Sequence, residues 1–238
     1  MKGKDWMRRA GMAAWMLVML IPVVSQEADS SDTEKKEEKR GYARFLSPDV
    51  KSQEGMFTVF VTDDQYYFEI PDSLLGRDML LGARVSELSS SSKVAAGEMR
   101  RAPILIRLSR NEEHVYMHQV VSGYASGAED PVTVAVERTS MDPVLKTFPI
   151  EAINPDSTAA VIDVTDFFSD EIGAISPFNS KYKAGKLEKD PTRILEALAF
   201  SGNVEVRTYM SYTKNDRPPF SIVMHRSWLL LPEEPMKP

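Results

Sequence analysis

The stretch from Gln65 to Leu88 (QYYFEIPDSLLGRDMLLGARVSEL) constrains the fold more than any other part of the chain. It contains two runs of strand composition, Gln65–Ile70 and Arg77–Leu88, with Pro71–Gly76 between them. Proline suits the first position of a helix, an acidic residue suits its first turn, and glycine suits the position after its end. The stretch therefore predicts a strand, a single helical turn and a second strand, to which further strands are added.

The residues just upstream predict a hairpin with the first of these strands. Met56–Thr62 (MFTVFVT) is β-branched and aromatic, and Asp63 and Asp64 separate it from Gln65–Ile70. Two such runs joined by two turn-forming residues are typical of a β-hairpin. Asp-Asp suits a type I′ turn less well than Asp-Gly, so a longer loop is the alternative.

The rest of the chain adds more strands and a few short helices. We expect strands at Pro103–Leu108, His114–Val121, Leu145–Ile153, Ala159–Val164, Asn203–Thr213 and Phe220–Leu231, and helical segments at Gly41–Pro48, at Asp166–Asp170 with Thr165 as its cap, and at Pro191–Phe200. Val132–Thr139 fits either a strand or a helix. Short turns between strands argue against a doubly wound parallel sheet. The predicted fold class is α+β: a strand-rich antiparallel meander or hairpin domain with a few short helices, after an N-terminal signal helix.

The first residues have the pattern of an export signal. Lys2, Lys4, Arg8 and Arg9 precede the apolar run Gly11–Val24, which is shorter than the roughly 20 residues that a membrane-spanning helix needs. Small residues follow, so we expect cleavage after Ser25 and export to the periplasm, the outer cell surface or the medium. An uncleaved anchor or a buried N-terminal helix is the alternative.

Composition divides the remaining chain. The segment 26–40 (QEADSSDTEKKEEKR) lacks large apolar residues and is predicted to be a disordered polar linker. A short leading segment, 41–55, follows, in which Tyr42, Phe45 and Leu46 are expected to dock on the main domain. The predicted β-rich domain spans 56–231, and 232–238 is a proline-containing tail or linker. With the signal peptide at 1–25, this accounts for all 238 residues.

Bulk composition excludes several classes of function. The absence of cysteine excludes disulfides, thiolate metal sites and a cysteine nucleophile. A net charge of −6 and the lack of a basic patch argue against binding to nucleic acid. No stable membrane span is expected once the signal has been removed.

The three histidines do not predict a metal site. His114 and His118 have the spacing of a zinc-binding helix, but Val115 stands where the metalloprotease motif requires glutamate. Their segment has strand composition, and on a strand a separation of four residues spans about 13 Å. One metal ion is too small for that span, and His225 lies far away in the sequence.

Serine and acidic residues give equally weak signals. Ser90-Ser91-Ser92-Lys93 matches the S-x-x-K pattern of penicillin-binding enzymes, but the companion motifs are absent. Two acidic groups surround predicted helix starts: Glu69, Asp72 and Asp78 with Arg77, and Asp163, Asp166 and Asp170 with Glu171. Helix capping and ion pairs explain both groups, and a calcium site or a glycosidase pair is the alternative. We therefore assign no catalytic, cofactor-binding or metal-binding residue and expect no cofactor, and we expect substitution of Asp72 or Arg77 to reduce stability rather than abolish a reaction.

Several blocks resemble the N-terminal region of large exported bacterial zinc-dependent metalloproteases, whose leading segments are domains of unknown function. The blocks, in chain order, are KKEEKRGYARFLSPDVKSQEGMFTVF, YYFEIPDSLLGRDMLLGARVSEL, AINPDSTAAVIDVTDFFSDEI, KLEKDPTRILEALAFSGNVEVRTYMSY and SWLLLPEEPMKP, so the resemblance covers about residues 35–238. In that family the H-E-x-x-H zinc motif lies further downstream, and nothing in this sequence matches it.

The resemblance implies a non-catalytic accessory domain that packs on or assists a metalloprotease catalytic domain, which is its expected partner. A stand-alone exported module that binds a protein or a glycan is the second hypothesis. A hydrolase with an unrecognised acid pair is the third.

Overall fold

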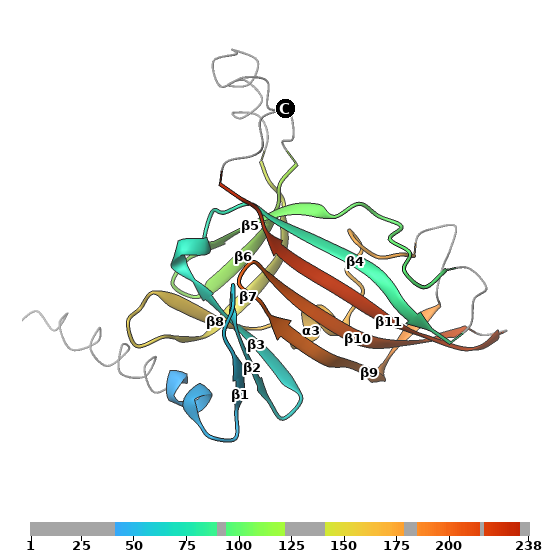
Figure 1. Cartoon of the computed structure of the whole chain (residues 1–238), viewed down its shortest axis with the longest axis horizontal. Helices are drawn as coiled ribbons and strands as arrows, with labels where there is room; N and C mark the ends of the chain where they lie inside the picture. Colours follow the sequence, from blue (N-terminus) through green and yellow to red (C-terminus); the bar gives the residue numbers. More distant parts are fainter. Residues whose placement is uncertain (1–40, 90–93, 122–140, 179–184, 215–216, 234–238) are drawn as a thin grey trace, which may run out of the picture.

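A computed structural model describes residues 41–89, 94–121, 141–178, 185–214 and 217–233. The predicted signal peptide, the linker 26–40, Val132–Thr139 and residues 234–238 of the tail therefore lie outside the described residues. Within the described ranges, eleven strands form one antiparallel sheet in the order β1-β2-β3-β8-β7-β6-β5-β4-β11-β10-β9 (Figure 1). This confirms the strand-rich antiparallel fold class.

The strands are β1 (Lys51–Gln53), β2 (Thr58–Thr62), β3 (Gln65–Pro71), β4 (Met79–Leu88), β5 (Ile104–Arg110), β6 (His114–Gln119), β7 (Val144–Ile153), β8 (Ala159–Asp163), β9 (Lys186–Ala199), β10 (Asn203–Lys214) and β11 (Arg217–Leu230). Three short helical segments accompany them: η1 (Arg44–Leu46), η2 (Asp72–Leu74) and α3 (Thr165–Ser169).

The predicted strand–turn–strand unit is β3–η2–β4, and it links the two parts of the sheet. The free edge of the β2–β3 hairpin pairs with β8, whereas β4 pairs with both β5 and β11. Asp63 and Asp64 have φ angles of 47° and 65°, so the hairpin loop has only two residues and needs no extension. A two-residue turn with positive φ angles matches the twist of the strands that flank it.

Alternation along the strands builds the core. The residues Val204, Val206, Thr208, Met210 and Tyr212, predicted to share one face of β10, are all buried. They pack with aromatic residues of β3 and β11 and with Phe57, which directly precedes β2. The ring of Phe57 lies 5.2 Å from that of Trp228, and the ring of Phe68 lies 6.0 Å from it. Burial of side chains of this size is worth about 1.5–3 kcal/mol each.

The sheet curves so that its two outer strands approach each other. The backbone N–H of Met56 donates to the carbonyl of Phe200 at 2.6 Å, and Gln53 Nε2 donates to the carbonyl of Ala199 at 3.0 Å. Figure 1 shows α3 behind β9 and β10, on the concave side of this sheet. The helix contacts β3, β9 and β10 and covers part of the interior.

The leading segment covers part of the outer face, as the sequence predicts. Tyr42 and Phe45 pack on Phe60 and Tyr67 in a small separate cluster. Leu46 departs from the prediction, because it is 67% exposed and does not dock. β1, which the sequence did not predict, pairs with β2 at the end of this segment.

The predicted helix at Pro191–Phe200 is wrong: all of these residues except Phe200 belong to β9. Thr192 and Ile194 are buried while Arg193 and Leu195 are exposed, which is strand alternation. Pairing with β10 outweighs the helix propensity of the leucine and alanine residues. Pro191 is compatible with the strand because β9 is an edge strand with irregular register.

Thr165 was predicted to cap α3, but the residue at the cap position is Val164. The Thr165 hydroxyl accepts a hydrogen bond from the N–H of Tyr66 at 2.8 Å, and Asp163 Oδ1 accepts one from the N–H of Thr165 at 2.8 Å. Thr165 therefore ties α3 to β3, and the acid before it satisfies a backbone donor of the first turn.

Candidate functional site

The acidic residue in the η2 turn is part of an ion pair. Arg110 donates from Nε and from a terminal nitrogen to the two carboxylate oxygens of Asp72, both at 2.7 Å. Arg77 donates to the carbonyl of Leu231 at 3.2 Å and lies 2.7 Å from the carboxylate of Glu233. Asp72 thus pairs with a different arginine from its sequence neighbour, while Arg77 holds the end of β11.

The other two acids of this first group also have structural contacts. Tyr42 donates a hydrogen bond to Glu69 Oε1 at 2.9 Å in a buried position, which fixes the leading segment on β3. Arg107 on β5 forms an ion pair with Asp78. Glu69 differs from the expected surface ion pair, because its partner is a buried tyrosine.

Three of the four residues in the second acidic group line a cavity of about 480 Å³ beside α3, and Asp163 does not. Asp166, Asp170 and Glu171 contribute from the helix and the residues after it, and Lys146 of β7 and Lys189 of β9 also belong to the lining. A mixed lining of carboxylates and amines can bind a polar or zwitterionic group. None of the three histidines lines this cavity, so acid–base chemistry there would depend on carboxylates alone.

A buried arginine binds the backbone next to these acidic residues. Arg226 on β11 is 3% exposed, and its guanidinium donates to the main-chain carbonyls of Phe168 and Asp170, the latter at 2.8 Å. Burial lowers the pKa of Arg226 to about 10, so it remains charged at neutral pH. Its Nε has no hydrogen-bond partner among the described residues. Arg226 therefore binds the carbonyls at the C-terminal end of α3, a contact that no local sequence pattern predicts.

Tyr212 accompanies Arg226 on the neighbouring strand. Burial raises the pKa of Tyr212 above its ordinary value, and the carboxylate of Glu171 raises it further. Both residues and Glu171 also line a second, very small cavity of about 10 Å³. Glu171 therefore lies between the two cavities and belongs to the lining of both.

The outer face of β6 carries two of the histidines. The rings of His114 and Tyr116 are 6.0 Å apart, and those of Tyr116 and His118 are 6.4 Å apart. Tyr116 therefore stands between the two histidines, as expected for a strand, and they do not share a ligand position. On this strand, the i,i+4 spacing of His114 and His118 does not indicate a metal site.

Cross-strand pairing creates a serine–histidine contact that sequence reasoning missed. Ser109 Oγ lies 2.8 Å from His118 Nε2, and His118 Nδ1 lies 3.5 Å from the main-chain oxygen of Asp142. Alternation along β5 and β6 could have predicted that both residues lie on the outer face. It could not have predicted the strand register that brings Ser109 next to His118. Ser109 is exposed on a strand, where its N–H belongs to the sheet and does not form an oxyanion hole.

A second such group surrounds the third histidine. His225 Nε2 lies 2.7 Å from Glu205 Oε2, and the Ser227 hydroxyl donates to the same carboxylate. Activation of a serine requires a base within hydrogen-bond reach of its hydroxyl. Here serine and histidine both bind the acid rather than each other, so the group ties β10 to β11 and is not arranged as a triad.

Metal binding has no support within the part of the chain that the structure describes. No group of three or more histidine, aspartate or glutamate side chains is positioned to hold an ion there. Ser90–Lys93, the S-x-x-K match, lies outside the described residues. In the same ranges, no helix has the length and apolar character needed to cross a membrane.

Comparison with known proteins gives two family matches. A family model described as a domain of unknown function (DUF5117) matches residues 97–238, and another described as a domain of unknown function (DUF5118) matches residues 39–88. The first match covers β5 to β11 and the second covers η1 to β4. No curated protein and no solved structure matches the chain.

Proposed function

The chain belongs to the DUF5117 family of domains of unknown function, and we propose that it is a non-catalytic accessory domain of an exported zinc-metalloprotease-like protein. Its role is to pack on or assist a catalytic domain that carries the zinc motif. The resemblance of five successive sequence blocks to the leading segments of such proteases supports this assignment, as does the order in which the two families follow each other.

The non-catalytic part of the proposal depends on one observation: several of the candidate acidic side chains already bind other side chains of the protein. Asp72 is held by Arg110, Asp78 by Arg107, and Glu69 by Tyr42. Glu205 is shared by a serine and a histidine. A general acid or base must instead face the reacting group of a substrate. These side chains face protein partners, which suits a scaffold better than an active site.

The reading frame after the codon for Pro238 gives the most direct test. A downstream H-E-x-x-H motif, in frame or after a frameshift, is the expected result. Fractionation of cells should place the polypeptide outside the cytoplasm, with its N-terminus after Ser25. A polypeptide that stays in the cytoplasm with residues 1–25 intact would contradict the export part of the proposal.

A stand-alone binding module is the second candidate, and the cavity of about 480 Å³ beside α3 is the observation that favours it. The purified chain should bind neither a protein nor a glycan through that cavity if the accessory role is correct. Saturable binding that is lost in Lys146→Ala and Lys189→Ala, together with a downstream frame that lacks a zinc motif, would favour the module instead.

Catalysis by the chain itself is tested separately. We expect no hydrolysis of casein or of glycans by the purified 238-residue chain, with or without added zinc. Robust turnover that does not depend on a metal ion, and that Asp170→Asn abolishes while the fold is retained, would overturn the accessory assignment in favour of a hydrolase with an acid pair.

A further inference from the structure

The cavity of about 480 Å³ beside α3 is lined by parts of the chain that lie far apart in the sheet. Five strands stand between β7 and β9 in the sheet order, yet residues of both belong to the lining together with α3 and the residues after it. The volume is within the range of small-molecule sites and is much larger than a single ion requires. The tertiary fold, rather than any one element, therefore forms this concave site.

Five charged side chains line the cavity without neutralising one another. They are the carboxylates of Asp166, Asp170 and Glu171 and the amines of Lys146 and Lys189. Among the described residues, none of the five takes part in an ion pair. Both kinds of charge are therefore available to form charge-assisted hydrogen bonds with a ligand.

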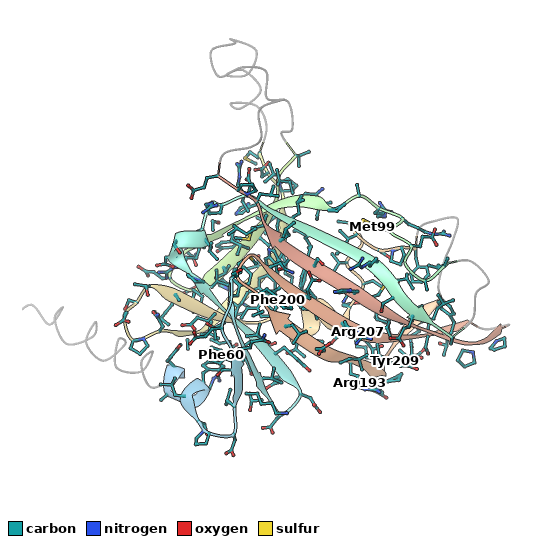
Figure 2. The ribbon with its side chains drawn as sticks, viewed as in Figure 1. Phe60, Met99, Arg193, Phe200, Arg207 and Tyr209 are labelled. Atoms are coloured by element: carbon teal, nitrogen blue, oxygen red, sulfur yellow. The ribbon has the colours of Figure 1, made fainter. Side chains whose placement is uncertain are left out.

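Charged residues on the outer face of the sheet differ in this respect. Figure 2 shows Arg193 of β9 close to Arg207 and Tyr209 of β10. The guanidinium of Arg193 lies 5.0 Å from the ring centre of Tyr209, and Arg207 forms ion pairs with Glu87 and Glu196. Partners within the molecule hold these two arginines, so they are less available to a ligand than the charges of the cavity.

A buried cation balances the charge of the cavity. Arg226 donates to the main-chain oxygen of Asp170 at 2.8 Å, and it lines the small cavity that shares Glu171 and Ile172 with the larger one. Its Nε has no partner among the described residues. Arg226 and the two lysines together match the charge of the three carboxylates. A region that is neutral but rich in both charges is complementary to a ligand that carries one charge of each sign.

The chemistry of the lining suits an organic ammonium group better than a metal ion. Within the described ranges, no group of three or more acidic or histidine side chains is positioned to hold a metal ion. An ammonium group requires only hydrogen-bond acceptors, and carboxylates supply them. Leu145, Phe167 and Ile172 add apolar surface to the same lining. A ligand that matches all of these groups has an ammonium group, a carboxylate and an apolar side chain.

We propose that this cavity binds a short apolar peptide whose two ends are free. The acids of α3 and of the residues after it bind the α-ammonium group, Lys146 and Lys189 bind the carboxylate, and Phe167 and Ile172 contact the apolar side chains. The inference goes beyond the accessory function and does not depend on it, because a short peptide is neither a folded protein nor a glycan. The frame downstream of Pro238 tests the accessory function alone, whereas peptide binding tests the cavity alone.

The probe is the dipeptide Leu-Leu, titrated into the purified 238-residue chain by isothermal titration calorimetry. We expect saturable 1:1 binding. Acetylation of the amino end or amidation of the carboxyl end should each weaken it at least about tenfold, because each removes charge-assisted hydrogen bonds. Free leucine carries the same two charges with less apolar surface, so it should bind more weakly than the dipeptide.

The double variant Lys146→Met/Lys189→Met locates the carboxylate. In this variant, Leu-Leu and its amide should bind with equal affinity, because amidation removes a charge that no lysine contacts any longer. Lys51→Met/Lys186→Met is the matched control, since both of these lysines are exposed and neither lines the cavity. The control should keep the tenfold difference. Circular dichroism with thermal unfolding shows whether each variant is folded, and the capped peptides test the unaltered protein even where a variant is not.

Four results would each overturn the proposal. The first is the absence of saturable Leu-Leu binding, and the second is equal affinity for the acetylated and the free dipeptide. The third is equal affinity for free leucine, which would assign the cavity to a single amino acid. The fourth is a tenfold loss on amidation that persists in folded Lys146→Met/Lys189→Met, which would place the carboxylate elsewhere.

Discussion

The buried guanidinium of Arg226 exerts an unusual influence on one short helix. It enters the interior from β11 and binds the carbonyls at the end of α3, where only about one turn of helix is present. A charge in such a site costs free energy through desolvation, and it is retained only where hydrogen bonds and nearby acids compensate. Glu171 and Asp170 supply the compensating charge. Arg226 therefore decides where α3 lies, although nothing in its local sequence marks it as different from a surface arginine.

Replacement of Arg226 should accordingly be costly. We expect Arg226→Met to lower the free energy of unfolding by about 2–4 kcal/mol, because two buried carbonyls lose their donor. Arg226→Lys should lose less, since the charge remains. Arg207→Met is the control: Arg207 forms ion pairs on the outer face with Glu87 and Glu196 and should contribute less than about 1 kcal/mol. Equal losses in the two methionine variants, measured by urea unfolding, would refute the special role of Arg226.

Four buried tyrosines make stability sensitive to alkaline pH. Burial is the main cause that raises the pKa of Tyr42, Tyr66, Tyr67 and Tyr212, and neighbouring carboxylates raise each pKa further. A tyrosine that ionises near pH 10 when unfolded and higher when folded stabilises the fold fully below about pH 10. That contribution is lost as the pH rises through the interval between the two pKa values. The lowered pKa of Arg226 has the opposite effect, because its deprotonation in the folded state raises stability as the pH rises in this range. The four tyrosines are expected to outweigh this single arginine.

We therefore expect the urea midpoint to fall as the pH rises above about 10, while it should be nearly flat between about pH 7 and 9. Tyr42→Phe removes one contribution and should make the alkaline decline shallower, although it lowers stability at neutral pH by leaving buried Glu69 without its donor. A urea midpoint that rises above pH 10 would show that deprotonation of Arg226 outweighs that of the tyrosines.

At the scale of elements, the contact between the outer strands depends on a glycine. A Cβ atom on Gly55 would lie 2.7 Å from the carbonyl oxygen of Phe200 and 2.8 Å from Ala199 Cβ. Backbone atoms cannot retreat as a flexible side chain can. The segment between β1 and β2 therefore approaches the end of β9 only because residue 55 has no side chain.

Gly55→Ala should separate these two edges and cost about 2–3 kcal/mol, in the range of other overpacked sites. Gly202→Ala is the matched control, since no atom would lie within 4 Å of its Cβ, and it should change stability by less than about 1 kcal/mol. Thermal unfolding and hydrogen exchange of the Met56 amide provide the measurements. An unchanged Met56 amide in Gly55→Ala would contradict the close approach.

The elements also show how far sequence reasoning reaches. Strands with regular alternation, such as β10, and turns with a chemical signature, such as Asp63-Asp64, were predictable because local residues determine them. β9 was not, because its leucines and alanines favour a helix locally and only the ladder with β10 reverses that preference. The same limit applies to the candidate sites. The contacts of Arg226 with α3 and of Ser109 with His118 depend on how distant strands pair, and no single segment of the sequence determines that pairing.

At the scale of the whole molecule, the two family matches do not correspond to two separate folded bodies. β3, which lies in the DUF5118 match, pairs with β8 of the DUF5117 match, and β4 of the DUF5118 match pairs with β5 and β11. The aromatic core crosses the same division, because Phe57 and Phe68 pack against Trp228. Each part alone would expose core aromatics and unpaired strand edges, so we expect neither part to be stable by itself.

We therefore expect residues 41–89 and 94–238 to be unfolded or aggregated when each is produced alone, and to form a 1:1 complex with the circular dichroism of the intact chain when they are produced together. A protease site placed within Ser90–Lys93 extends the test to the intact protein. After cleavage there, the two pieces should remain associated and unfold in one cooperative transition, because β3–β8 and β4–β11 pairing still holds them. A 41–89 fragment that unfolds cooperatively by itself would instead establish two autonomous domains.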